Sequence, residues 1–174
     1  EFTDSGEALE KLETGVDRAV LSTDDPSVYR YDQMDTNSSE NSSMQMGTNS
    51  TAYYFSVASS SIANFFDEMY LNTPWEQHYN NLDGRTILDR LASVKYFVVK
   101  KGKESDLPYG YSRLSGEAEK NGKTYLAYAD EDALPLGYTY DSWISREDYD
   151  KMTVTEKQQA LLQGVVLDDS FLPE

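Results

Sequence analysis

Helical spacing of apolar residues is clearest directly after three serines at 59–61, which can supply an N-cap. The apolar positions of this predicted helix recur at intervals of three and four residues and are Ile62, Phe65, Phe66, Met69 and Tyr70. A thinner apolar stripe with an acidic outer face predicts another helix at 6–20. A short helix is also expected after Asp83-Gly84. Its inward positions are Ile87, Leu88 and Leu91.

Short apolar and aromatic runs predict the strands. The run at 95–100 directly follows the short helix, so this helix-to-strand unit is expected at the centre of the fold. Asn121-Gly122 is typical of a hairpin tip between two strands. The remaining strands are expected at 28–31, 53–56, 109–114, 124–128 and 136–140. The whole pattern predicts a single α+β domain, with helices packed on a mixed sheet of five or six strands.

Two helix starts near the end of the chain carry capping signals. Ser145 with Asp148 is expected to begin one short helix. Thr153 with Glu156 matches a capping box, in which each residue satisfies a backbone N–H of the other. Both helices are therefore predicted from local sequence.

The most polar stretch of the chain lies at 35–51. It contains three triplets that match the acceptor pattern for N-glycosylation, namely Asn37-Ser38-Ser39, Asn41-Ser42-Ser43 and Asn49-Ser50-Thr51. A mobile surface loop is the ordinary interpretation of such a composition. We therefore divide the chain into an N-terminal helical extension at 1–27 and an α+β domain at 28–174 that contains this polar loop.

Acidic residues dominate the charge of the chain. Its 174 residues include 31 Asp and Glu against 15 Lys and Arg, so the formal net charge is −16. A phosphate backbone or an anionic lipid surface would be repelled by this charge, and nucleic acid is not an expected partner. The 14 Tyr, 6 Phe and 2 Trp supply apolar area for a core. The lack of cysteine excludes disulfides and thiolate chemistry.

Motifs for catalysis, cofactors and metals are missing. The chain has no glycine-rich phosphate loop and no Gly-x-Ser-x-Gly, and its single histidine, His78, excludes sites that need two imidazoles. Three acidic clusters lack the ligand spacing of a calcium loop and are expected to be solvated turns. They are Asp24-Asp25, Asp130-Glu131-Asp132 and Asp168-Asp169. We expect no cofactor, no metal site and no catalytic residue.

Aromatic residues in polar segments are the best candidates for contacting a ligand. Trp75 lies near His78 and Tyr79, and a flat aromatic face can stack on the apolar face of a sugar ring. The plainer alternative is that Trp75 covers the edge of the core. The candidate ligand-facing residues lie at expected strand ends or in polar loops. They are Tyr54, Ser56, Trp75, His78, Tyr79 and Tyr109.

An ordered set of short motifs between residues 28 and 165 carries a resemblance to a known family. The motifs are Val28-Tyr29-Arg30, Tyr54-Phe55-Ser56, Leu82-Asp83-Gly84-Arg85, Val94-Lys95-Tyr96-Phe97-Val98, Leu107-Pro108-Tyr109-Gly110-Tyr111, Ala133-Leu134-Pro135-Leu136-Gly137-Tyr138 and Lys157-Gln158-Gln159-Ala160-Leu161-Leu162-Gln163. This succession resembles the extracytoplasmic region of bacterial YfhO-type membrane proteins. These are regarded as polytopic glycosyltransferases that use lipid-linked sugars.

The resemblance implies a soluble accessory domain on the extracellular face of the cell membrane of a Gram-positive bacterium. Its implied partners are the transmembrane helices of the parent protein and a glycan or polyprenyl-phosphate sugar. The parent enzyme would modify cell-envelope polymers such as teichoic acids. In such enzymes the catalytic acid lies in a loop between membrane helices. No stretch of this chain matches that loop, so no catalytic residue is carried over.

Two other functions stay open at this point. A free-standing carbohydrate-binding or surface-interaction module without catalysis would present an exposed row of aromatic residues. A secreted hydrolase would need two carboxylates that face each other across a concave pocket, with at least one raised pKa.

Overall fold

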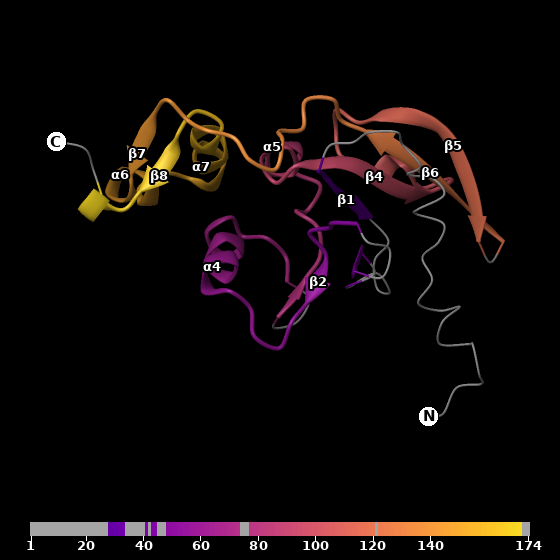
Figure 1. Ribbon diagram of the computed structural model, residues 1–174, viewed down its shortest axis with the longest axis horizontal. Coiled ribbons are helices and arrows are strands. Elements are labelled where there is room, and N and C mark those ends of the chain that lie inside the picture. Colours follow the sequence, from indigo (N-terminus) through magenta and orange to yellow (C-terminus); the bar gives the residue numbers. More distant parts are fainter. Residues whose placement is uncertain are drawn as a thin grey trace.

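The main sheet of the protein has four strands in the order β1-β4-β6-β5, within a computed structural model that describes residues 28–33, 41, 43–44, 48–73, 77–120 and 122–171 (Figure 1). These strands are β1 (Arg30–Gln33), β4 (Val94–Lys100), β5 (Ser112–Lys120) and β6 (Lys123–Ala129). β1 runs parallel to β4, and the other neighbours are antiparallel. The predicted α+β class with a mixed sheet is confirmed, with four strands in this sheet rather than five or six.

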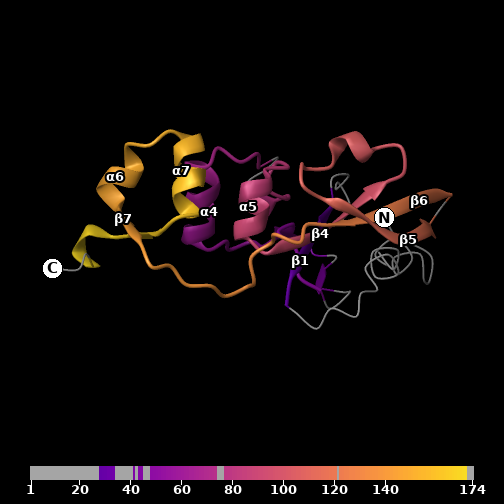
Figure 2. The ribbon, with the colours of Figure 1, turned by 90° about the horizontal axis from the view of Figure 1, so that it is seen from above.

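The remaining strands form two small pairs. β2 (Tyr53–Tyr54) pairs antiparallel with β3 (His78–Tyr79), and β7 (Trp143–Ser145) pairs in parallel with β8 (Val165–Leu167). The described helices are α4 (Ser60–Glu68), α5 (Thr86–Leu91), α6 (Arg146–Asp150) and α7 (Val154–Leu161), with 3₁₀ turns η1 (Glu104–Asp106) and η2 (Asp169–Phe171). Figure 2 shows these α-helices gathered on one side of the molecule, away from the tip of the β5–β6 hairpin.

β4 is one of the two inner strands of the sheet, and both of its faces are buried. On one face, Tyr96 and Val98 pack with Tyr31 of β1 in one hydrophobic cluster. Successive side chains on a strand point to opposite faces. Phe97 therefore lies on the other face, where its ring meets that of Tyr111 edge-on with 5.2 Å between centroids. The predicted central strand is confirmed.

A second hydrophobic cluster holds the helices together. It contains Phe66 of α4, Met69 just after α4, Leu88 of α5, Tyr149 of α6 and Ala160 of α7, all buried. This cluster packs the C-terminal helices α6 and α7 against the earlier helices, so the two halves of the chain share one interior.

The stripe predicted for α4 is only partly buried. Phe66 and Met69 enter the core, whereas Ile62 is exposed. The helix ends at Glu68, and Tyr70 follows with a positive φ of 49° and an exposed side chain. The turn after the helix therefore takes Tyr70 off the helical face, and the apolar stripe is shorter than its spacing predicts.

The caps predicted at Ser145 and Thr153 and the predicted hairpin turn are confirmed, whereas Ser59 stands at the N-cap of α4 without a side-chain cap hydrogen bond. The Ser145 side chain accepts the backbone N–H of Asp148, and both bonds of the Thr153 and Glu156 capping box are present. β5 and β6 form the expected hairpin, with Gly122 at a φ of +69° in its turn. Such signals depend on neighbours in sequence, so they can be recognised without tertiary information.

Residues 136–140 do not form the predicted strand. The Tyr138 hydroxyl donates to the carbonyl of Leu91 at 3.1 Å, and the Tyr140 hydroxyl donates to the carbonyl of Leu161. Both carbonyls belong to the last residues of helices, where no further helical N–H is available. The alternating aromatic residues of this segment therefore satisfy helix ends rather than pair with another strand.

Three predicted features fall on residues that the structure does not describe. The helix at 6–20, the N-terminal extension at 1–27 and Trp75 lie outside the described residues. The described part of the polar loop consists of 41, 43–44 and 48–51. Within the described ranges, no helix is both long and apolar enough to span a bilayer.

Candidate functional site

The β2–β3 pair brings three of the predicted ligand-facing residues together. We call its four residues, Tyr53, Tyr54, His78 and Tyr79, the aromatic ribbon. Tyr54 lies opposite His78 with stacked rings at 4.5 Å between centroids, and Tyr53 stacks on Tyr79 at 4.8 Å. Because side chains alternate along a strand, the two stacks lie on opposite faces of the ribbon.

The two stacks differ in their exposure. Tyr79 is 5% exposed and its ring also meets Phe66 of α4 edge-on, so this stack belongs to the core. Burial, followed by the neighbouring Tyr79, raises the pKa of Tyr53 to about 12. Tyr54 is 39% exposed. The Tyr54 and His78 stack is therefore the one that can present an aromatic face to a ligand.

Asn41 holds the exposed strand of the ribbon in place. Its side-chain amide donates to the carbonyl of Tyr54 at 2.9 Å, and its side-chain oxygen accepts the Tyr54 N–H at 3.1 Å. Asn49 similarly donates to the carbonyl of Tyr29 at 3.2 Å. Two of the three predicted glycosylation triplets thus use their asparagine amides to bind backbone. These residues of the polar segment therefore make defined contacts with backbone 13 and 20 residues away.

A hollow of about 350 Å³ borders the buried stack of the ribbon. It is lined by Ala58, Ala63, Phe66, Asp67, Thr73, Gln77 and Tyr79. Gln77 immediately precedes His78, and the lining combines the polar side chains of Asp67, Thr73 and Gln77 with apolar ones. Concave spaces of this mixed lining are typical of small-ligand sites.

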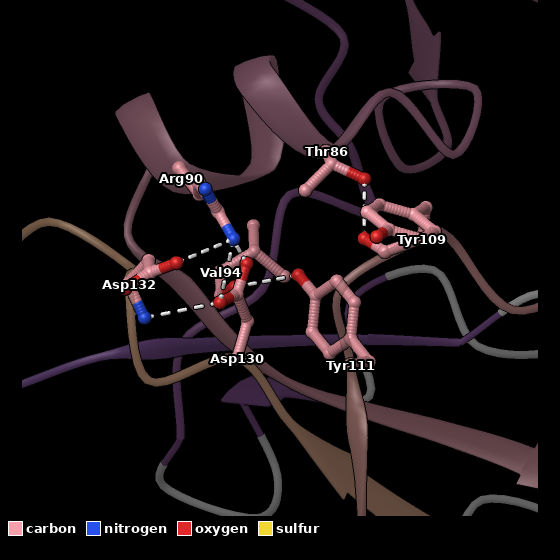
Figure 3. A network of polar contacts seen from close by, with 7 residues as sticks. All are labelled: Thr86, Arg90, Val94, Tyr109, Tyr111, Asp130 and Asp132. Atoms are coloured by element: carbon pink, nitrogen blue, oxygen red, sulfur yellow. Dashed lines mark hydrogen bonds and ion pairs between the residues drawn. The ribbon is translucent and has the colours of Figure 1, made fainter.

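The other predicted site residues are placed differently. Ser56 lies just beyond the end of β2 and is exposed. Tyr109 lies in the turn before β5, next to α5 rather than on the ribbon (Figure 3). The structure therefore groups Tyr54, His78 and Tyr79, and puts Tyr109 on a different element.

A network of polar contacts fixes the turn that carries Tyr109 (Figure 3). The Thr86 hydroxyl donates to the carbonyl of Tyr109 at 2.6 Å, and the Tyr111 hydroxyl donates to the carbonyl of Val94 at 2.7 Å. Gly110 has a φ of +98°, and a Cβ there would lie 3.3 Å from the Arg90 guanidinium. The backbone is held from both sides, while the Tyr109 side chain is 92% exposed.

Asp130 in the same network is not the solvated residue predicted from its acidic cluster. Its carboxylate is 2% exposed and accepts two bonds from Arg90, at 2.7 and 3.1 Å, and one from the Asp132 N–H at 3.0 Å. Glu131 and Asp132 remain exposed. Arg90 supplies the positive charge that makes burial of one member of the cluster tolerable.

Two further carboxyl groups are buried, and both have raised pKa values. Burial raises the pKa of Asp32 to about 6, although Thr51, Ser50 and Arg30 oppose the shift. Burial, then the charges of Asp32 and Asp130, raises the pKa of Asp89 to about 8. Both side-chain oxygens of Asp89 lack a hydrogen-bond partner among the described residues. Because both groups are enclosed, they do not face each other across an open pocket as a hydrolase dyad requires.

Thr51→Val is expected to lower the free energy of unfolding by about 1–3 kcal/mol, because it removes a donor from buried Asp32. The Thr51 hydroxyl and N–H and the Ser50 hydroxyl are the donors to this carboxyl. Urea unfolding at pH 7 measures the loss, with Thr155→Val on the exposed face of α7 as the matched control. Equal stability of the two variants would show that the bond to Asp32 contributes nothing.

Comparison with known proteins places this α+β domain in a bacterial membrane protein. A family model described as "Bacterial membrane protein YfhO" matches residues 2–173, and the chain therefore belongs to the YfhO family. It is 26% identical over 155 residues to the "Uncharacterized protein YfhO" of Bacillus subtilis (strain 168). That match covers 87% of this chain and 17% of the relative, so the chain spans less than a fifth of that protein. No solved structure gives a significant match.

Proposed function

We propose that this chain is an extracytoplasmic accessory domain of a membrane glycosyltransferase, and that it holds the glycan acceptor. The parent enzyme would transfer sugars from a polyprenyl-phosphate donor to cell-envelope polymers such as teichoic acids. Membership of a bacterial membrane protein family supports the membrane setting. The single observation that carries the binding role is the exposed stack of Tyr54 on His78.

The stack has the properties of a sugar platform. The rings of Tyr54 and His78 lie face to face at 4.5 Å, so a ligand can meet the stack on the outer face of the more exposed ring, Tyr54. An aromatic face of this kind suits the apolar face of a pyranose ring. The two hydrogen bonds between the Asn41 side chain and the Tyr54 backbone hold this strand in one position before a ligand binds. A preorganised surface loses less conformational freedom on binding than a mobile one.

The proposal leaves catalysis to other parts of the parent protein. The buried carboxyls of Asp32, Asp89 and Asp130 are covered by side chains and backbone, so a substrate cannot reach them in this conformation. The described residues would instead position an acceptor beside a membrane-embedded centre. The transmembrane helices of the parent protein are then the structural partner of the domain, on the extracellular face of the membrane.

Tyr54→Ala is expected to weaken binding of teichoic-acid fragments or neutral oligosaccharides about five- to tenfold, because stacking contributes about 1 kcal/mol. Calorimetric titration of the 174-residue chain measures the affinity. Tyr109→Ala is the matched control, since it removes another exposed tyrosine from a different turn.

The outcomes distinguish a domain that binds the glycan acceptor from one that only supports the membrane helices of the parent protein. Saturable binding that falls in Tyr54→Ala and persists in Tyr109→Ala supports the proposal. Absence of binding by the unaltered chain at millimolar oligosaccharide would overturn it. Equal binding by the unaltered chain and by Tyr54→Ala would also overturn the assignment of the platform.

A further inference from the structure

A concentration of positive charge lies at the end of the main sheet, in a chain whose net charge is −16. A hollow of about 460 Å³ opens between the turn after β4 and the hairpin turn that leads into β6. We call it the lysine pocket. Its lining residues are Lys100, Lys101, Gly102, Lys103, Gly122, Lys123 and Thr124. Four of the 15 Lys and Arg residues of the chain therefore surround one space.

The backbone of the two turns gives the lysine pocket a defined frame. The Lys101 N–H donates to the carbonyl of Thr124 at 2.9 Å, which ties the turn after β4 to the first residues of β6. The Lys103 N–H donates to the carbonyl of Lys100 at 2.9 Å and closes that turn. The lysines are thus carried by hydrogen-bonded turns at the end of the sheet, rather than by a single unsupported loop.

Glycines leave room at the rim of the pocket. Gly102 and Gly122 have φ values of +90° and +69°, and no atom lies within 4 Å of the position that a Cβ would occupy at either residue. Glycine adopts these backbone angles without steric cost. The absence of side chains at both positions lets a small ligand approach the lysine ammonium groups and the turn backbone.

The electrostatics of the pocket are those of an anion site. Burial, then the charges of Lys123 and Lys103, lowers the pKa of Lys100, so its neighbours disfavour its positive charge. The Lys101 ammonium lies 3.5 Å from the Glu117 carboxylate, and both side chains of this pair are exposed. An exposed pair of this kind contributes little and is readily replaced. A bound anion would relieve the mutual repulsion of the lysines.

We propose that the lysine pocket binds a phosphate group. Lysine ammonium groups bind phosphate oxygens as compact point charges with several donors. A small phosphate group is commensurate with a space of about 460 Å³ that four lysines line. The inference is independent of the aromatic ribbon, which lies on other elements of the fold.

The phosphate could be carried by a small ester or by a lipid headgroup at a membrane surface. The end of β4 and the tip of the β5–β6 hairpin, whose turns line the pocket, lie at the end of the molecule away from α6 and α7 (Figures 1 and 2). The pocket is formed by two turns that project from the sheet, so either source can reach it. The same ammonium groups recognise both, and the experiment below distinguishes them.

The test uses the 174-residue chain at low ionic strength, with inorganic phosphate as the first probe. NMR titration follows the backbone amides of Gly102, Gly122 and Thr124. We expect saturable shifts, and at least tenfold weaker binding in the double variant Lys100→Gln with Lys123→Gln. The matched control removes the same charge elsewhere, through Lys151→Gln with Lys157→Gln near α6 and α7. Added salt should weaken the binding.

A second probe and a second variant keep the outcomes decisive. Vesicles of phosphatidylglycerol, compared with vesicles of phosphatidylcholine, test the membrane source by co-sedimentation. The double variant Lys101→Gln with Lys103→Gln changes only exposed lysines. It replaces Lys100→Gln with Lys123→Gln in the titrations if that variant is poorly folded. Saturation by inorganic phosphate indicates a small ester, and binding to anionic vesicles alone indicates a headgroup.

Two results would overturn the proposal. One is the absence of binding to both inorganic phosphate and anionic vesicles. The other is equal weakening by the pocket variants and by the control variant, since the response would then follow total charge rather than the pocket. Tyr54→Ala should leave phosphate binding unchanged, so failure of the glycan role and failure of the phosphate site can be told apart.

Discussion

Arg90→Leu is expected to lower the free energy of unfolding at pH 7 by about 3–5 kcal/mol, because it leaves a buried carboxylate without its partner. Arg90 donates two bonds to Asp130 and also pairs with Asp132 at 2.8 Å. Without the guanidinium, the charge of Asp130 would share the interior with Asp32 and Asp89. The carboxyl must then lose its charge or draw water inward.

Urea unfolding at pH 7 measures this loss, with Arg113→Leu as the matched control. Arg113 pairs with Glu117 at 2.7 Å, but both side chains are exposed, so its removal should cost less than about 1 kcal/mol. Asp130→Asn, added to Arg90→Leu, should recover part of the stability because it removes the unpaired charge. Similar losses for Arg90→Leu and Arg113→Leu would refute a special role for the buried pair.

Asp89→Asn is expected to raise the free energy of unfolding at pH 8 by about 3 kcal/mol. The carboxyl is 0% exposed, and folding raises its pKa from 3.8 to about 8. A shift of this size corresponds to roughly 5 kcal/mol against folding when the unfolded chain is ionised. The unpartnered amide of asparagine offsets part of the gain, by about 1–3 kcal/mol.

The sign of the pH dependence follows from the raised pKa. Between pH 3.8 and about 8, the folded protein holds a proton on Asp89 that the unfolded chain has lost. The contribution of this group to stability is therefore complete below pH 3.8 and is lost as the pH rises toward 8. Asp32, with a pKa raised to about 6, adds a loss in the same direction over a narrower range.

Chemical denaturation at pH 4, 6 and 8 measures this dependence. Asp89→Asn should flatten the decline in stability, whereas Asp106→Asn on the exposed η1 turn should leave it unchanged. A steeper decline in Asp89→Asn than in the unaltered chain would contradict the assignment of Asp89 as a buried, protonated carboxyl.

Local sequence was sufficient for the elements whose signals lie within a few residues. The capping box at Thr153, the cap at Ser145 and the hairpin around Gly122 all form where their motifs stand. The central strand was also recognisable, since a run of β-branched and aromatic residues suits a strand that is buried on both faces. The strand predicted at 136–140 failed because its tyrosine hydroxyls bind distant helix ends.

The candidate site was only partly visible in the sequence. Tyr54, His78 and Tyr79 were named as ligand-facing residues for their types and positions, and the structure assembles them as one ribbon. Three features were not predicted: the burial of Tyr79, the hydrogen bonds of Asn41 with the backbone of Tyr54, and the position of Tyr109 next to α5 rather than on the aromatic ribbon. Each depends on pairing between segments far apart in sequence, for which the local pattern carries no signal.

By itself, the sequence determined the α+β class, the local caps and turns, the resemblance to the YfhO family and the strongly acidic balance. Only the tertiary structure decided where charge is buried and where it gathers. Asp130 is enclosed because Arg90 reaches it from another element, and four lysines meet because two turns are joined across the sheet. Net charge sums over the whole chain, whereas binding and burial respond to the few charges that folding brings within several ångströms of one another.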